Sequence, residues 1–248
     1  MLKVMMISHS PNPEKVVAAA AKMCYSNSGA ENILDKLDDE KTAKFLEHLT
    51  QMGHESPLEH ISFTFAVEGV SRALLAQLTR HRLASYSVKS QRYVEEAGYT
   101  YITPPEILAN PDAKALYDQT MADIGKAYEE LTKVLFEKHK ATMDEKAAKK
   151  KAIEDARFVL PNACETKLIM TFNARSLLNL FKMRCCNRAQ WEIQALADEI
   201  LRQVKEVAPV IFRYAGPECV RGVCPEGSMS CGKRSEMREK YLGNNKGE

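Results

Sequence analysis

Two short strand-like segments, set among longer helical ones, constrain the fold of this chain most strongly. In residues 61–67 every second side chain is a large apolar one, a period that predicts a half-buried β-strand. Residues 166–172 form a second predicted strand. Most of the remaining chain has helical periodicity. We therefore expect an α+β fold in a single domain, with a small antiparallel sheet packed with long helices.

Helical periodicity and capping residues predict the other elements. Asn12, Ser71 and Asn173 are expected N-caps, because each precedes a helical run and has a side-chain oxygen that can accept a hydrogen bond from backbone N–H. The predicted helices cover residues 13–26, 38–54, 71–82, 113–141, 143–161, 174–183 and 189–207. A third strand is expected within residues 98–107, closed by two prolines, and a serine-rich loop before it, after residue 82.

The chain has no obvious linker, but its end differs from the rest. Residues after Ala215 lack periodicity and contain three cysteines, Cys219, Cys224 and Cys231. We expect one main domain, residues 1–215, and a cysteine-containing tail, residues 216–248, that is peripheral or partly disordered. The tail spacing leaves zinc, a disulfide or free thiols open.

Composition is that of a globular protein rather than a membrane protein. Of the 248 residues, 45% are hydrophobic and 27% charged, and no apolar run approaches the ~20 residues of a membrane span. The first ten residues do not resemble a signal peptide. An odd number of cysteines, seven, favours reduced thiols. We expect a cytoplasmic protein that does not bind a membrane.

Positive charge is concentrated locally, although the net charge is only +2. Residues 69–94 and residues 166–191 each hold five Lys or Arg and no acidic residue. If these two windows meet in the fold, they form an anion pocket. Such a pocket suits a phosphorylated small molecule better than nucleic acid, which needs a broad basic face.

The first basic window contains the triplet Arg80-His81-Arg82, followed by Ser90, Gln91 and Arg92. Forked guanidinium donors match phosphate oxygens, and the hydroxyl and amide add donors for a pyrimidine edge. A solvated helix end whose arginines cap carbonyls is the alternative. In the second window, Arg175 and Asn179 share a helix face, and Asn173 and Arg184 are further ligand candidates.

Two other candidate sites are weaker. Residues 54–60, HESPLEH, have Ser56 where a zinc motif needs histidine and a proline inside the helical spacing, so we expect no metal there. Cys24 and Cys164 have no neighbouring base and are expected to be small buried apolar residues. A glycine-rich phosphate loop is absent from the sequence, so side chains and helix ends would have to hold a nucleotide.

Three motifs in order resemble those of one enzyme family. The triplet, seven further residues and Ser90 match the R-H-R-x7-S signature of the flavin-dependent thymidylate synthases. The similarity continues in residues 53–65 and 172–194 and covers roughly residues 1–215. It implies reductive methylation of dUMP to dTMP, with 5,10-methylenetetrahydrofolate as carbon donor and FAD, reduced by NADPH, as hydride source. It also implies an intertwined homotetramer with active sites between subunits.

By position, the resemblance implies two sets of ligand contacts. The FAD contacts are His54, Ser56, Arg80, His81, Arg82, Asn173, Ala174, Arg175 and Asn179. The dUMP contacts are Gln77, Arg80, Ser90, Gln91, Arg92, Arg157 and Arg184. Arg184 is the implied catalytic residue, because it matches an arginine that favours ionisation of uracil N3. Val88 departs from relatives that carry Glu, so only its backbone is expected to contact ligand.

The residues suit this chemistry. Carbon 5 of uracil is a poor nucleophile, and one way to activate it adds a cysteine thiolate at carbon 6. The sequence offers no convincing cysteine of that kind, whereas its arginines can stabilise negative charge on the pyrimidine. Ser90 lacks an evident base and is assigned to binding.

Two rival classes of protein make different predictions. A nucleic-acid-binding module needs a continuous basic face and stacking aromatics, but only Tyr86 and Tyr93 are near, and Glu95 and Glu96 flank the stretch. We therefore expect no nucleic-acid partner. A zinc protein built on the tail would lose stoichiometric zinc when its cysteines are mutated. Bound flavin would make the protein yellow and distinguish it from both.

Overall fold

The computed structural model describes residues 1–243, apart from the side chain of Gln51. The end of the predicted tail, residues 244–248, lies outside the described residues. The chain divides into two compact units, which we describe separately. Unit 1 comprises Met1–Lys3, Glu68–Ala76 and Ser87–Leu168, and unit 2 comprises Val4–Val67, Gln77–Tyr86 and Ile169–Glu248.

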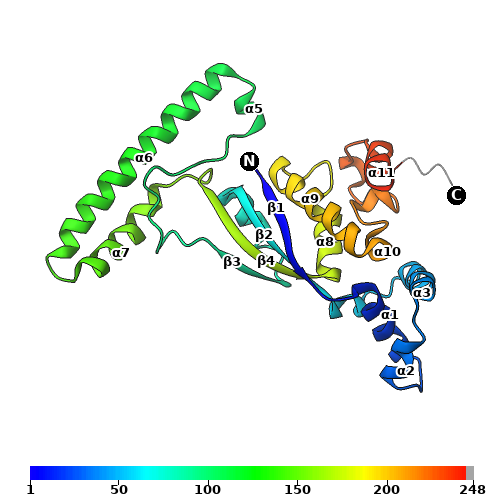
Figure 1. The fold of residues 1–248 in the computed structure, drawn as a ribbon. Helices are drawn as coiled ribbons and strands as arrows, with labels where there is room; N and C mark the ends of the chain where they lie inside the picture. The colour runs from blue at the N-terminus through cyan, green and yellow to red at the C-terminus, as the bar shows by residue number, and fades with distance from the viewer. Residues whose placement is uncertain (244–248) are drawn as a thin grey trace. The chain divides into compact units, whose positions relative to one another are not determined.

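Four strands form one sheet in the order β1-β2-β4-β3 (Figure 1). Their bounds are β1 Lys3–His9, β2 Ser62–Ser71, β3 Ala84–Val88 and β4 Glu165–Asn173. Backbone bonds from Ser10 N to Ser62 O and from Ala174 N to Ile61 O join opposite ends of neighbouring strands, as in antiparallel pairs. The α+β fold with a small antiparallel sheet is therefore confirmed.

The two predicted strands, β2 and β4, are central because one face of each is buried and mostly apolar. Phe63, Phe65, Met170 and Phe172 are at most 1% exposed, and burial of such side chains drives this face inward. On the opposite face, the hydroxyls of Thr64 and Thr171 lie 2.9 Å apart. The alternation read from the sequence thus corresponds to a real difference between the two faces.

The third strand lies elsewhere than predicted. Residues 98–107 form only an isolated bridge, between Tyr101 and Cys164, and the prediction of a strand there was wrong. The strand is β3, inside the predicted serine-rich loop. Its Tyr86 and Val88 are half-buried, whereas Ser85 and Ser87 are exposed, so the serines form the polar half of a two-residue period.

Unit 1 is built mainly from helices. The longest two, α6 and α7, pack against each other as a helical hairpin (Figure 1). The Asn110 and Asp144 side chains accept hydrogen bonds from the first backbone N–H groups of α6 and α7. The helices of this unit are α5 Pro105–Leu108, α6 Pro111–Lys140, α7 Glu145–Ala156 and η2 Arg157–Val159, and α4 Arg72–Leu78 divides between the units.

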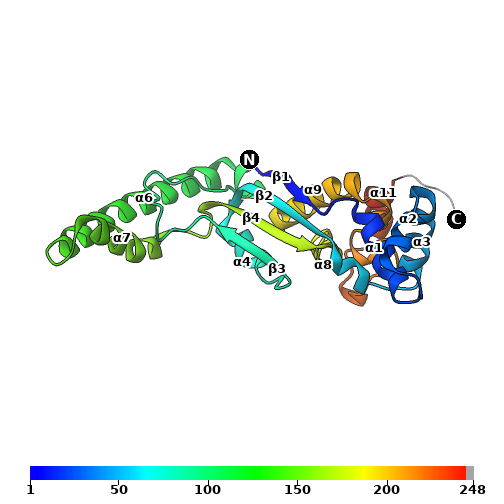
Figure 2. The same cartoon turned by 60° about the horizontal axis from the view of Figure 1, so that its bottom comes forward.

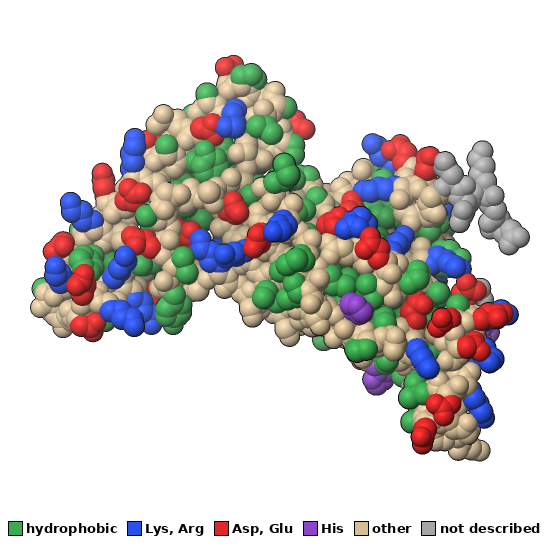
Figure 3. All heavy atoms as spheres, viewed as in Figure 1, with side chains coloured by type: hydrophobic (Ala, Val, Ile, Leu, Met, Phe, Trp, Pro, Cys, Tyr) green, Lys and Arg blue, Asp and Glu red, His purple; other side chains and the backbone are tan. Residues whose placement is uncertain are grey.

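Charges on the α6–α7 hairpin are mixed in sign. On the face shown in Figure 3, Lys and Arg side chains over these helices are interspersed with Asp and Glu. Several are paired, including Lys149 with Glu95 at 2.7 Å. The visible face of this hairpin is therefore not the continuous basic surface that a nucleic-acid-binding module would need.

Unit 2 packs helices on its part of the sheet (Figure 2). Phe212 is central to this core, with ring centroids 5.6 Å from Phe63 and 5.9 Å from Phe181. Gln203 bonds to Met6 N and Val4 O, so it satisfies two backbone groups on the outer strand β1. The helices are α1 Pro13–Met23, α2 Ala30–Asp35, α3 Asp39–Gln51, η1 Ser56–His60, α8 Ala174–Arg184, α9 Trp191–Val207, α10 Pro209–Phe212, η3 Glu218–Val220, η4 Gly227–Met229 and α11 Arg234–Leu242.

Two of the three predicted N-caps form the expected hydrogen bond. Ser71 Oγ accepts from Leu74 N at 3.0 Å, and Asn173 Oδ1 accepts from Ser176 N at 2.8 Å, so both are confirmed. Asn12 precedes α1 but has a left-handed backbone (φ 45°), and its side chain makes no capping hydrogen bond. None of the helices in the described residues combines the length and the apolar character that a membrane crossing requires.

The tail contains elements that the sequence did not reveal. Residues after Ala215 form η3, η4 and α11, and Tyr241 of α11 is only 7% exposed. Its hydroxyl lies 2.9 Å from the Cys185 carbonyl oxygen and 2.6 Å from Asp198 Oδ1. Through position 243, the tail is therefore packed on α8 and α9.

Candidate functional site

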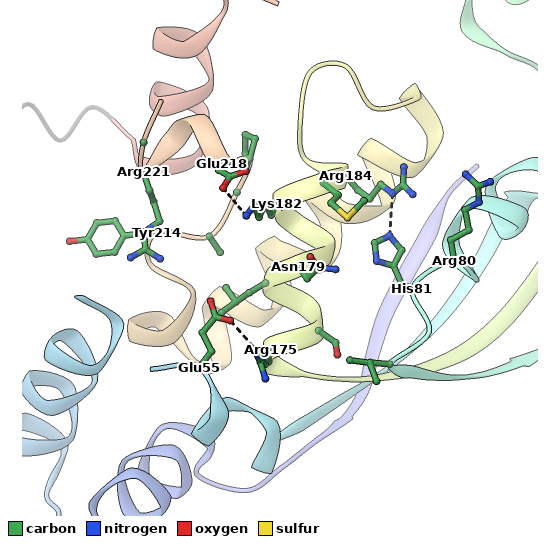
Figure 4. Close-up of a pocket in the computed structure, with 18 of the residues that line it drawn as sticks. Glu55, Arg80, His81, Arg175, Asn179, Lys182, Arg184, Tyr214, Glu218 and Arg221 are labelled. Carbon is green, nitrogen blue, oxygen red and sulfur yellow. Dashed lines mark hydrogen bonds and ion pairs between the residues drawn. The ribbon is translucent and has the colours of Figure 1, made fainter. Parts of the chain in front are cut away.

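A cavity of about 1070 Å³ in unit 2 brings together much of the predicted site (Figure 4). Its walls come from Glu55, from the turn after α4, from one face of α8 and from the start of the tail. The predicted residues that line it are Arg80, His81, Arg82, Arg175, Asn179 and Arg184. Arginines from the two acid-free windows therefore do meet within this unit, which is the condition that the sequence set for an anion pocket.

Arg184 and His81 are in direct contact in this cavity. Arg184 Nε donates a hydrogen bond to His81 Nε2 at 3.2 Å. Burial, followed by the positive charge of Arg184, lowers the pKa of His81. Burial and neighbouring Arg80 likewise lower the pKa of Arg184, which still remains a guanidinium cation. A neutral imidazole thus accepts from an arginine that keeps its other donors for a ligand.

Tyr86 fixes the turn that carries His81. Its hydroxyl lies 2.8 Å from the His81 carbonyl oxygen and 3.0 Å from that of Leu78, at the end of α4. Burial raises the pKa of Tyr86 to about 12, so the phenol remains a donor. Its ring packs edge-on against Phe172, with centroids 5.9 Å apart. The triplet is therefore held by the buried face of the sheet.

Some basic residues of the acid-free windows form ion pairs with glutamates from other parts of the chain. Arg175 pairs with Glu59 at 2.5 Å and with Glu55 at 3.3 Å, and Lys182 pairs with Glu218 at 2.7 Å. Within the described residues, the cavity arginines Arg80, Arg82, Arg184 and Arg221 form no ion pair with a carboxylate. The cavity consequently keeps unneutralised positive charge.

Four predicted flavin contacts lie outside the cavity wall. Asn173 uses its side chain to cap α8, and Ala174 is fully buried, with its N–H bonded to Ile61 O at 3.1 Å. Ser56 is exposed in η1. His54 stacks on Tyr25, with ring centroids 6.1 Å apart, and its buried Nδ1 has no hydrogen-bond partner among the described residues. The predicted dUMP contact Gln77, at the end of α4, is also outside the wall.

Unit 1 holds a second group of predicted residues. Ser90 Oγ accepts from Arg92 N at 3.2 Å, and Gln91 Nε2 donates to Cys164 Sγ at 3.5 Å. The Arg92 guanidinium pairs with Glu154 at 2.9 Å. Arg157 Nε donates to the carbonyl oxygen of the same glutamate at 3.1 Å. Serine, glutamine and arginine donors are thus fixed in one turn, and Glu154 links this turn to Arg157.

Lys89 anchors this turn. Its N–H donates to Lys167 O at 2.9 Å, and its carbonyl accepts from Arg72 Nη2 at 2.8 Å. Its ammonium pairs with Glu96, 5% exposed, at 2.7 Å. Every polar group of this residue is therefore engaged in holding the segment that leads to Ser90.

Comparison with known proteins decides the family. A family model described as "Thymidylate synthase complementing protein" matches residues 5–210. A flavin-dependent thymidylate synthase of Clostridium tetani is 55% identical over 242 residues, 97% of each chain. This chain belongs to the flavin-dependent thymidylate synthase family. Enzymes of that name from Geobacter sulfurreducens and Nitratidesulfovibrio vulgaris are 46% and 44% identical, over 97% and 93% of this chain and 98% and 94% of their own. The resemblance inferred from the motifs is confirmed.

In this thymidylate synthase family member, the cysteines are not arranged as a ready nucleophile. Cys164 is fully buried, and burial, with Glu96 nearby, raises the pKa of its thiol. Burial also raises the pKa of Cys185. Cys24 is exposed, so the prediction that it is buried was wrong. All seven thiols are unpaired, and among residues 1–243 no group of three or more His, Cys, Asp or Glu side chains is placed to hold a metal.

Some cavity residues of this family member could not be recognised from the sequence. Lys182 stood in a basic window without an assigned role, and Glu55 was considered only as part of a metal motif. No local pattern indicated that Tyr214, Glu218 and Arg221 line a cavity, because their place in the wall depends on how the end of the chain packs. The residues in question are Glu55, Lys182, Tyr214, Glu218 and Arg221.

Proposed function

We propose that this protein makes dTMP by reductive methylation of dUMP, using 5,10-methylenetetrahydrofolate, FAD and NADPH. The observation that carries the proposal is the arginine-lined cavity, in which Arg184 contacts a neutral His81 at 3.2 Å. Membership of the flavin-dependent thymidylate synthase family supplies the reaction class.

The cavity residues fit a flavin dinucleotide. The volume of about 1070 Å³ suits a large ligand, and Arg80 and Arg82 lack carboxylate partners among the described residues, so they can complement a pyrophosphate. Bound flavin would supply the hydride. The residues that would hold it are His54, Ser56, Arg80, His81, Arg82, Asn173, Ala174, Arg175 and Asn179. Asn173 and Ala174 also fix the start of α8, because Asn173 Oδ1 accepts from Ser176 N and the Ala174 N–H is bonded to Ile61 O.

Seven residues form the proposed dUMP contacts. In unit 1 the turn supplies a hydroxyl, an amide and a guanidinium, which match the ribose, base and phosphate of a nucleotide. Val88, in β3 just before the turn, would contact ligand only through its backbone. The residues are Ser90, Gln91, Arg92 and Arg157 in unit 1 and Gln77, Arg80 and Arg184 in unit 2.

Arg184 is the proposed catalytic residue. Its guanidinium would donate hydrogen bonds where negative charge develops on the uracil, at N3 and O2, and so activate carbon 5. His81 orients the guanidinium by accepting a hydrogen bond from its Nε–H, which leaves the Nη groups for substrate. The raised pKa of the buried Cys164 thiol argues against the alternative route, addition of a thiolate at carbon 6.

Assembly and location are part of the proposal. We infer an intertwined homotetramer whose active sites combine residues of different subunits, so the unit 1 and unit 2 groups need not come from one chain. Residues 1–215 would act as one catalytic domain, followed by the tail 216–248. Seven unpaired thiols support a reducing compartment, the cytoplasm. Light scattering on the purified protein would measure the subunit number.

The visible absorption spectrum tests the function. Under anaerobic conditions, NADPH should bleach a flavin band in the purified protein. The band should return only when dUMP and methylenetetrahydrofolate are both added, with dTMP as product. A colourless protein that cannot be loaded with FAD would contradict the proposal.

A further inference from the structure

The tail forms one wall of the arginine-lined cavity. The family match ends at residue 210, yet Tyr214, Glu218 and Arg221 all line the cavity. In Figure 4 these three residues lie on one side of α8, and Arg80 and His81 lie on the other. The tail is thus part of the candidate site, and its contribution lies beyond the residues that the family model describes.

Contacts of Tyr241 and one ion pair hold this wall in place. The Tyr241 hydroxyl is bonded to the end of α8 and to α9, as described above, and Lys205 Nζ donates to the Tyr241 carbonyl at 2.7 Å. Gly216 lies against the Tyr241 ring, where an added Cβ would come within 3.1 Å. Lys182 of α8 pairs with Glu218 at 2.7 Å. The position of η3 is therefore fixed by packing and charge.

Arg221 differs from the other cations on this side. The charges of Lys182 and Arg175 are matched by glutamates, but Arg221 pairs with no carboxylate of residues 1–243. Its Nη2 makes one long hydrogen bond, to Thr50 O at 3.4 Å. A guanidinium has five N–H donors, so most of its donors remain for a ligand in the cavity.

We infer that Arg221 forms a phosphate subsite on the tail wall, binding an oxyanion of a dinucleotide held in the cavity. The inference rests on the proposed function. Forked arginine donors match phosphate oxygens. Because Lys182 and Glu218 neutralise each other, the net positive charge of this wall comes from Arg221. FAD and NADPH both carry the required phosphate chemistry, and the test separates them.

The experiment uses the full-length protein stripped of flavin. Dissociation constants for FAD and for riboflavin, which lacks phosphate, are measured on this flavin-free protein by flavin fluorescence. The KM for NADPH is measured by its oxidation after each variant has been reloaded with saturating FAD. The variants are Arg221→Gln and Arg221→Glu. Arg213→Gln is the matched control, because Arg213 is an exposed arginine of the same region that pairs with Glu47 and does not line the cavity. Thermal melts confirm folding of each variant.

We expect Arg221→Gln to weaken FAD about tenfold, and Arg221→Glu more, with riboflavin unchanged, if the flavin phosphates are the ligand. A similar rise in the KM for NADPH alone would assign the subsite to the nicotinamide dinucleotide. If the FAD dissociation constant and the KM for NADPH of the Arg221 variants equal those of Arg213→Gln, the inference is wrong while the proposed function stands. A wild-type protein that binds neither dinucleotide would overturn both.

Discussion

Arg184 Nε and His81 Nε2 lie 3.2 Å apart, and the direction of this hydrogen bond fixes the state of the histidine. A guanidinium can only donate, so Nε2 must carry the lone pair. His81 is therefore neutral, with its proton on Nδ1. The contact positions Arg184 without neutralising it, which a carboxylate partner would have done.

Replacing Arg184 by Ala should abolish dTMP formation while FAD stays bound. The variant loses the donors that stabilise charge on the uracil, whereas other arginines of the cavity remain. Product is measured by chromatography and flavin by absorbance. Arg184→Lys should fail too, because the forked geometry is lost. Arg202→Ala is the control, since Arg202 lies on an exposed surface paired with Glu199 and Glu206. If Arg184→Ala instead lost flavin and still bound dUMP, Arg184 would be a flavin contact and not the catalytic residue.

Stability should fall as the pH is lowered, partly because of His81. Its pKa is lowered in the folded chain, against about 6.5 when unfolded. Below that pH the unfolded chain takes up a proton that the folded chain does not. The contribution is therefore complete above about pH 6.5 and is lost as the pH falls through the folded pKa. Urea unfolding across this range should show a shallower pH dependence for His81→Gln; equal slopes would rule out this origin.

The Lys89–Glu96 pair should show strong coupling. Lys89→Ala would leave Glu96, 5% exposed, with an unpaired charge, and should cost about 3 kcal/mol of unfolding free energy. Adding Glu96→Gln should recover much of that loss, because the buried charge is then gone. Urea denaturation of the two single variants and the double variant gives the coupling energy. Simple additivity would mean that the pair is not coupled.

Phe212 should be the most sensitive aromatic of the unit 2 core. Phe212→Ala removes a fully buried ring that contacts Phe63 and Phe181, and should cost about 3–5 kcal/mol. Phe158→Ala is the matched control, because that ring is 81% exposed, and should change stability by less than about 0.5 kcal/mol. Comparable losses in the two variants would contradict this picture of the core.

Strands were predictable where one face is apolar and the other is not. β2 and β4 have that pattern, whereas β1 reads as a nearly continuous apolar run, and its Met5 and Ile7 remain 51% and 46% exposed. β3 was missed because serines at alternate positions look like a loop. Its register depends on pairing with β4, which no local pattern reveals.

Within the site, charge windows were more informative than single motifs. They indicated an anion pocket if the two windows met, and Arg80 and Arg184 do line one cavity. They did not predict the counter-ions Glu55, Glu59 and Glu218, which come from other segments. The part of the cavity wall formed by the tail could not be predicted for the same reason, because only tertiary packing brings those residues to the cavity.

The anchoring of the tail also sets the order of events during synthesis. Tyr241 is made 56 residues after Cys185, whose carbonyl lies 2.9 Å from its hydroxyl. Strands and α8 can fold as they leave the ribosome, since chains fold from their N-terminal part first. The wall that carries Arg221 cannot be fixed until α11 has emerged, so the cavity is completed only after the sheet and α8 have been made.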